Sequence, residues 1–170
     1  MTDGLRELLI LRHAKAQKDA GLRDYERALN ERGTRDAPRV GIWLRNHGLR
    51  PDLVISSPAL RARQTTLFTV LPLGLNGDEV RWEEELYLAD LQALRELVAA
   101  TPDPVRRLLL VGHNPGLEDL VLSLAGVEPG LPDNRLRTAA LVHLALASDW
   151  QDLSPASARL LNYYRPAPPA

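Results

Sequence analysis

Three short apolar segments constrain the fold of this chain more than any other feature of its sequence. They are "LLIL" (8–11), "DLVISS" (52–57) and "RRLLLVGH" (106–113). Their apolar runs do not alternate with polar residues, so each predicts a strand that is buried on both faces. Helical patterns separate the segments, and this alternation is typical of an α/β fold, a three-layer α/β/α sandwich with a mostly parallel central sheet.

The predicted helices have clear start and stop signals. A helix over 30–46 is predicted from an asparagine at its start and a glycine shortly after its end. Ser57 is predicted to cap the next helix, with Pro58 in its first turn, and Asn114 to cap a later one, with Pro115 in its first turn. A further helix is predicted over 89–100, and late strands are predicted within 135–146 and 158–165.

Length and composition fit one domain, predicted to span residues 1–165, with a proline-rich tail at 166–170. The 21 basic and 22 acidic residues give a formal net charge of −1, so we expect no nucleic-acid partner. The chain has no cysteine, which excludes thiolate metal sites and cysteine nucleophiles. It shows no signal peptide and no apolar run of the ~20 residues that span a bilayer. We therefore expect a cytoplasmic protein that does not bind membranes.

Basic side chains stand at the ends of the three predicted strands. Arg12 and His13 follow the first strand, Arg61 lies in the helix after the second, and His113 follows the third. Ligands of open α/β sheets bind at the carboxyl ends of the strands, so we expect these four side chains to converge. Two arginines and two histidines suit a compact multivalent anion such as phosphate.

No carboxylate cluster with metal-ligand spacing accompanies these residues. The sequence therefore predicts phosphoryl chemistry that needs no metal and no other cofactor. A histidine can then act as the nucleophile and form a phosphohistidine intermediate. The attacking ring nitrogen must be unprotonated, so we expect the other nitrogen to donate to a backbone carbonyl or a similar acceptor.

Three motifs resemble those of the histidine phosphatase superfamily (phosphoglycerate mutase-like proteins), most closely the branch of SixA-type phosphohistidine phosphatases. They are "LRHAKA", "SSPALRARQT" and "VGHNPGLEDL", in this order along the chain. The resemblance implies a phosphoglycerate mutase-like fold in which His13 is the nucleophile. It implies that Arg12 and Arg61 bind the phosphoryl oxygens and that His113 contacts the phosphoryl group. The segment "DYERALNERG" resembles the part of the family from which an arginine reaches the pocket, here Arg27.

The leaving group separates the possible substrate classes. The larger mutase and acid-phosphatase branches supply a carboxylic acid that protonates it; the candidates here are Glu83, Glu84 and Glu85, of which we choose Glu85. The SixA-type branch manages without that acid, and a phosphorylated imidazole leaves readily. We therefore expect phosphohistidine on a protein as the substrate. Two alternatives remain open: a phosphomonoesterase for a small phosphorylated metabolite, and a phospholigand-binding module without catalysis.

Three other polar residues near these motifs are expected to be structural. Ser57 is expected to cap a helix rather than act as a nucleophile, because the sequence places no general base beside it. Arg63 is expected to face solvent, since it points away from Arg61 on a helix. His143 lies in "ALVHLAL" and is expected to be a satisfied strand histidine.

Overall fold

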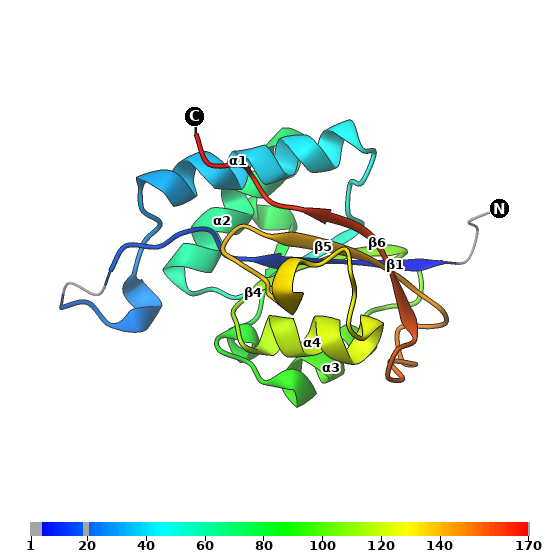
Figure 1. Ribbon diagram of the computed structural model, residues 1–170. Coiled ribbons are helices and arrows are strands. Elements are labelled where there is room, and N and C mark those ends of the chain that lie inside the picture. The colour runs from blue at the N-terminus through cyan, green and yellow to red at the C-terminus, as the bar shows by residue number, and fades with distance from the viewer. Residues whose placement is uncertain (1–4, 19–20, 170) are drawn as a thin grey trace.

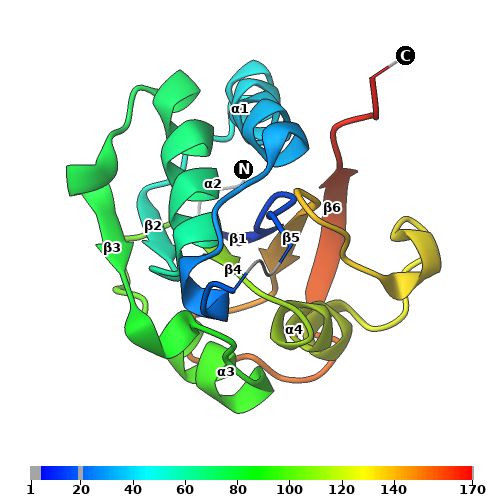
Figure 2. The ribbon, with the colours of Figure 1, turned by 90° about the vertical axis from the view of Figure 1, so that its left-hand side faces the viewer.

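A six-stranded sheet forms the centre of the molecule (Figures 1 and 2). The structure, a computed structural model, describes residues 5–18 and 21–169. The sheet order is β3-β2-β4-β1-β5-β6. Its strands are β1 (Arg6–Arg12), β2 (Leu53–Ser56), β3 (Val80–Trp82), β4 (Arg107–Gly112), β5 (Leu141–Leu146) and β6 (Ala158–Tyr164). The pairs β3–β2, β2–β4 and β4–β1 are parallel, whereas β1–β5 and β5–β6 are antiparallel, which confirms a mostly parallel sheet.

Helices cover both faces of this sheet, so the predicted three-layer architecture is confirmed. Helices α1 (Glu31–Asn46) and α2 (Leu60–Val70) lie on one face, and α3 (Leu91–Ala99) and α4 (Gly116–Ala125) lie on the other (Figure 1). The run "LLIL" of β1 contributes side chains to the hydrophobic cores on both faces of the sheet. Leu8 and Ile10 join the core under α3 and α4, whereas Leu9 and Leu11 join the core under α1. Successive strand residues point to opposite faces, which explains why the run does not alternate.

The start of α1 is confirmed, because the side chain of Asn30 accepts a hydrogen bond from the backbone N–H of Gly33. The predicted caps of the two other helices are wrong. Helix α2 begins two residues later than Pro58, with Ala59 at the cap position. The hydroxyl of Ser57 lies before the helix, where it contacts both Ala59 N–H and the ring of His113. Helix α4 is preceded by Pro115 at the cap position. The amide nitrogen of Asn114 donates to Glu118 and to the Leu136 carbonyl, and its Oδ1, the atom that a cap would use, accepts no hydrogen bond from the described residues.

The predicted domain limits, 1–165 with a tail at 166–170, stay a prediction. Within that tail, the carbonyl of Ala167 accepts a hydrogen bond from Arg39 at 2.7 Å. Among the residues that the structure describes, no helix has the length and apolar character needed to cross a bilayer. The cytoplasmic location expected from the sequence likewise stays a prediction.

Candidate active site

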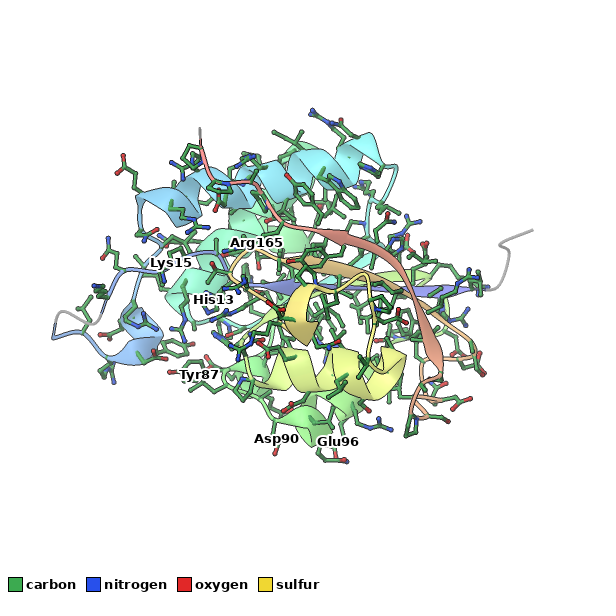
Figure 3. All side chains as sticks on the ribbon, viewed as in Figure 1. His13, Lys15, Tyr87, Asp90, Glu96 and Arg165 are labelled. Carbon is green, nitrogen blue, oxygen red and sulfur yellow. The ribbon has the colours of Figure 1, made fainter. Side chains whose placement is uncertain are left out.

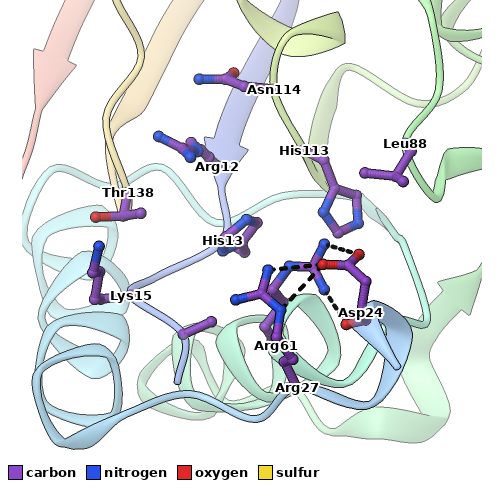
Figure 4. A pocket seen from close by; sticks show the side chains of 11 residues that line it. Arg12, His13, Lys15, Asp24, Arg27, Arg61, Leu88, His113, Asn114 and Thr138 are labelled. Carbon is purple, nitrogen blue, oxygen red and sulfur yellow. Dashed lines mark hydrogen bonds and ion pairs between the residues drawn. The ribbon is translucent and has the colours of Figure 1, made fainter. Parts of the chain in front are cut away.

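A pocket of about 360 Å³ opens where the carboxyl ends of β1 and β4 lie side by side (Figure 4). The register pairs Arg12 with Gly112, so the residues that follow the two strands, His13 and His113, become neighbours. The structure brings five predicted site residues to this pocket. Its lining consists of Arg12, His13, Lys15, Ala16, Asp24, Arg27, Arg61, Leu88, His113, Asn114 and Thr138.

His13 is buried, and its protonation is fixed by the backbone. Its Nδ1 lies 2.8 Å from the carbonyl oxygen of Ala14. A carbonyl only accepts, so Nδ1 carries the ring proton and Nε2 keeps its lone pair, as the sequence led us to expect. Burial lowers the pKa of His13 to about 3; the Ala14 hydrogen bond opposes this shift, and the nearby His113 adds to it. The ring is therefore neutral at pH 7.

The loop that carries His13 is held on both sides. The backbone N–H of Ala14 donates to the Thr65 hydroxyl of α2 at 2.9 Å, and Asn30 N–H donates to the carbonyl of Lys15 at 2.9 Å. Gly33 in the first turn of α1 lies against the same carbonyl, and a Cβ there would collide with it. Helices α1 and α2 thus fix the backbone on which the nucleophile candidate sits.

His113 faces His13, with ring centroids 5.3 Å apart and ring planes 52° apart. Its Nε2 lies 2.7 Å from the hydroxyl oxygen of Ser57, which itself accepts from the backbone N–H of Ala59 at 3.3 Å. Its Nδ1 is buried and has no hydrogen-bond partner among the described residues. Burial, and next the charge of Arg61, lowers the pKa of His113 to about 3. Ser57 is therefore a partner of a pocket histidine, a role that the sequence did not reveal.

Two arginines flank the histidines. Arg61 is 3% exposed, and Arg12 donates through Nη1 to the carbonyl of Leu136 at 3.2 Å. Burial lowers the pKa of Arg12, and the carboxylate of Glu118 opposes the shift. The Nε atoms of Arg12 and Arg61 are both buried, and neither has a partner in the part of the chain that the structure describes. Each guanidinium therefore retains donor capacity beside the pocket.

Asp24 is a charged pocket residue that the sequence did not suggest. It lies in a one-turn 3-10 helix (Asp24–Glu26) and collects hydrogen bonds from three side chains (Figure 4). Arg61 donates to its backbone carbonyl at 2.7 Å and to Oδ2 at 2.8 Å. Arg27 donates through Nε and Nη2 to Oδ1, and the Tyr87 hydroxyl donates to Oδ2 at 2.6 Å. The Tyr87 bond first, and then both arginines, hold the pKa of Asp24 well below its usual range.

Other candidates lie outside the pocket. Glu85 is exposed and is not among the described residues that line the cavity. The neighbouring Glu84 accepts from the Tyr25 hydroxyl, and Glu83 pairs with Arg81. No geometry therefore favours Glu85 as the acid. In the part of the chain that the structure describes, no three His, Cys, Asp or Glu side chains gather in a way that could hold a metal ion.

Two expectations about structural residues are confirmed. Arg63 is exposed, and its guanidinium carbon lies 4.8 Å from the ring centroid of Trp82. His143 is buried within β5 and satisfied on both ring nitrogens, with Nε2 3.0 Å from Glu7 and Nδ1 3.0 Å from the amide of Asn162.

Comparisons with known proteins agree with this geometry. The family model described as "Histidine phosphatase superfamily (branch 1)" matches residues 8–87. An uncharacterised protein of Mycobacterium tuberculosis is 33% identical over 162 residues, covering 92% of this chain and 99% of that protein. The solved structure of a SixA from Nakamurella multipartitia, provisionally assigned as a phosphohistidine phosphatase, is 31% identical. It has a TM-score of 0.83 and covers 97% of this chain and 98% of that one.

A SixA described as a protein histidine phosphatase, solved with tungstate, is 25% identical, with a TM-score of 0.78. The match covers 94% of this chain and 96% of that one. The chain therefore belongs to the histidine phosphatase superfamily, within its SixA-type branch. It is a phosphatase with the phosphoglycerate mutase-like fold.

Proposed function

We propose that this phosphatase hydrolyses phosphohistidine on a protein, without a metal ion, through a phosphorylated His13. The observation that carries the proposal is the hydrogen bond from His13 Nδ1 to the carbonyl of Ala14. This bond leaves the Nε2 lone pair available at pH 7. The lowered pKa of His13 keeps the ring neutral, which a nucleophile requires.

In the first step, Nε2 of His13 attacks the phosphorus, and the bond between phosphorus and the substrate nitrogen breaks. Arg12 and Arg61 each have an Nε donor that none of the described residues binds, and these donors suit the equatorial phosphoryl oxygens. The Nδ1 atom of His113 offers a further hydrogen-bonding group for the phosphoryl oxygens. Arg27, tied to Asp24 on the same side of the pocket, adds positive charge near the group in transfer.

In the second step, water attacks the phosphorus of phosphorylated His13, and the bond between phosphorus and Nε2 breaks. Because Nδ1 already carries a proton, the ring leaves as neutral imidazole and takes up no further proton. The water releases one proton to solvent, and inorganic phosphate departs. The Ala14 carbonyl stabilises the positive charge that the ring carries while it is phosphorylated.

The protonation state of the pocket carboxylate also favours phosphohistidine as the substrate. Of the described residues that line the pocket, Asp24 is the one with a carboxyl group. Its pKa lies far below its usual range, so it holds no proton to give at pH 7. A substrate ring that is protonated on its second nitrogen leaves as neutral imidazole and needs no enzyme acid. An alkyl phosphate would need such a proton. The likeness to SixA proteins described as histidine phosphatases also supports this choice.

A substrate panel and a trapping experiment test the proposal. Wild-type protein should hydrolyse a phosphohistidine peptide with a higher kcat/KM than sugar or nucleotide phosphates. Rapid acid-free quenching with a labelled substrate should capture label on His13, and His13→Ala should lose turnover by several orders of magnitude while staying folded. Faster turnover of a small phosphorylated metabolite would overturn the substrate class. Binding without any labelled protein would mark a module that does not catalyse.

A further inference from the structure

The pocket carries more positive charge than a phosphoryl group requires. Among the described residues, its charged lining consists of four cations and one carboxylate. With neutral histidines these residues carry a net charge of +3, in a chain whose formal net charge is −1. A phosphoryl group brings a charge of about −2. Arg12, Arg27 and Arg61, less the carboxylate of Asp24, already match that charge. The unmatched cation is Lys15.

Lys15 is exposed, and within the described residues its ammonium has no hydrogen-bond or ion-pair partner. Its backbone is fixed, since its carbonyl accepts from Asn30 N–H and packs against Gly33. The flexible side chain is thus anchored two residues beyond His13 and remains free to bind an anion that arrives with the substrate.

Figure 4 places Lys15 apart from Arg27 and Arg61, two of the three arginines that line the pocket. Lys15 and Thr138 lie on one side of His13, and Asp24, Arg27 and Arg61 lie on the other. Figure 3 likewise shows Lys15 and Arg165 above His13, and Tyr87, which binds Asp24, below it. In Figure 4, Arg12 lies above His13, beside Thr138. A phosphoryl group held at His13 by Arg12 and Arg61 leaves the exposed Lys15 for a different part of the substrate.

Thr138 adds to the polar character of this side. Arg165 donates to the carbonyl of Thr138 at 3.0 Å and to its hydroxyl oxygen at 3.4 Å. The Thr138 hydroxyl thereby accepts from Arg165 and keeps its own hydrogen to donate. Arg165 makes no salt bridge with a carboxylate among the described residues. An ammonium, a hydroxyl donor and a nearby guanidinium together suit a carboxylate.

We propose that Lys15 and Thr138 form a second anion subsite that recognises an Asp or Glu side chain next to the phosphohistidine of the partner protein. The inference rests on the proposed function and adds to it the sequence context of the phosphorylated histidine. Lys15 is then a specificity-determining residue, which acts on binding rather than on the bond that breaks.

The chain supplies a matched control. Lys18 is the other lysine of the sequence, lies three residues further on, and is also exposed without a partner among the described residues. It does not line the pocket. Lys15→Ala and Lys18→Ala therefore remove the same charge from the same loop, and only the first removes it from the proposed subsite.

The experiment compares two phosphohistidine peptides that differ only in having Glu or Gln beside the phosphorylated residue. Wild-type protein should favour the Glu peptide about two- to fivefold in kcat/KM, the range of a solvent-exposed ion pair. This preference should shrink as the salt concentration is raised from about 0.05 M to about 0.5 M, because salt screens interactions between exposed charges. Lys15→Ala should reduce the ratio to about one, and Lys18→Ala should keep the wild-type ratio.

The outcomes separate the inference from the function on which it rests. Equal hydrolysis of the two peptides by wild-type protein overturns the subsite and leaves the phosphohistidine activity intact. An equal loss on both peptides in Lys15→Ala also overturns it, because Lys15 would then serve the phosphoryl group itself. A preference for a small substrate with two phosphates over both peptides rejects the acidic protein segment as the occupant. Failure to hydrolyse either peptide rejects the proposed function and the subsite together.

Discussion

Asp24 accepts two hydrogen bonds from Arg61, one at its backbone carbonyl and one at Oδ2, across 37 residues of sequence. Both donors are Nη atoms, so Asp24 occupies one edge of the planar guanidinium. The Nε atom, which lies on another edge, has no partner among the residues that the structure describes. We infer that Asp24 is a positioning residue, which orients the free edge of Arg61 toward the phosphoryl group.

Asp24→Asn should lower kcat/KM for a phosphoryl substrate by roughly 10- to 150-fold, the range for a lost hydrogen bond to a charged group. The reason is that the amide nitrogen of asparagine replaces one carboxylate oxygen and cannot accept a hydrogen bond. It would face a donor of Arg61, Arg27 or Tyr87, and that hydrogen bond would be lost. Steady-state kinetics with a matched urea unfolding curve measures both the activity and the stability. A higher affinity for phosphate in this variant would instead identify Asp24 as a competitor of the substrate.

Tyr87→Phe is the matched control for that variant. It removes one donor to Asp24 and keeps both hydrogen bonds from Arg61. Its loss in kcat/KM should therefore be clearly smaller than that of Asp24→Asn. Equal losses in the two variants would show that the Tyr87 bond, rather than the carboxylate itself, fixes Arg61.

The contact between Ser57 and His113 determines a ring tautomer. The Ser57 hydroxyl oxygen accepts from Ala59 N–H and lies 2.7 Å from Nε2 of His113. If the hydroxyl donates, His113 carries its proton on Nδ1, the buried atom without a partner, and can donate it to a phosphoryl oxygen. Ser57→Ala should release this tautomer and lower kcat/KM roughly three- to tenfold, as expected for one neutral hydrogen bond.

Nitrogen NMR of the His113 ring reports the tautomer directly, which a purely structural role of Ser57 would not change. The wild-type ring should show a protonated Nδ1, and Ser57→Ala should show a mixture of tautomers. Ser57→Thr keeps the hydroxyl and should restore both the spectrum and most of the rate. A wild-type ring protonated on Nε2 contradicts this assignment.

The strand-end residues could be predicted because their positions follow from the buried strands. An apolar run that does not alternate predicts a strand covered on both faces, and parallel strands bring Arg12, His13 and His113 to one edge. Predicting that these residues converge requires the order of the strands and helices along the chain, and no knowledge of tertiary contacts. Arg61 follows for the same reason, since it lies in the first turn of the helix after β2.

Asp24 and Ser57 could not be predicted in the same way, because their partners are distant in sequence. Asp24 becomes a pocket residue only when the segment after β1 folds back against α2 and reaches Arg61. Ser57 precedes a proline and a helical pattern, which fits a helix cap locally. Tertiary contact with His113 overrides that preference. Glu85 was chosen from an acidic run, and local sequence does not tell which way such a run points.

Treatment with a chelator should leave kcat/KM unchanged, because the proposed steps rest on arginine and histidine side chains. The test compares the phosphohistidine peptide before and after EDTA and dialysis, with Mg²⁺, Mn²⁺ or Zn²⁺ added back. A rate that falls with EDTA and recovers with one of these ions would contradict the metal-independent mechanism. A rate that falls and does not recover would point to damage by the treatment, which circular dichroism before and after dialysis detects.

Acid should destabilise the protein through its two pocket histidines. Burial lowers the pKa of His13 and of His113 to about 3, against an ordinary value of 6.5. At a pH between these two pKa values, both rings are neutral in the folded state and take up protons when the chain unfolds. The unfolded state then binds more protons, so stability is fully present above pH 6.5 and is lost as the pH falls toward 3. Well below pH 6.5, each histidine contributes a slope of about 1.4 kcal/mol per pH unit.

Urea unfolding in phosphate-free buffer from pH 7.5 to about 4.5 measures this slope, since bound phosphate would favour the protonated rings. The control is the double variant His13→Gln, His113→Gln, which keeps polar side chains of similar size and cannot titrate. Its free energy of unfolding should depend on pH less steeply than that of the wild type by up to about 2.7 kcal/mol per pH unit. Equal slopes in the two proteins would mean that both rings are protonated in the folded state near pH 6, and that His13 is then a poor nucleophile at that pH.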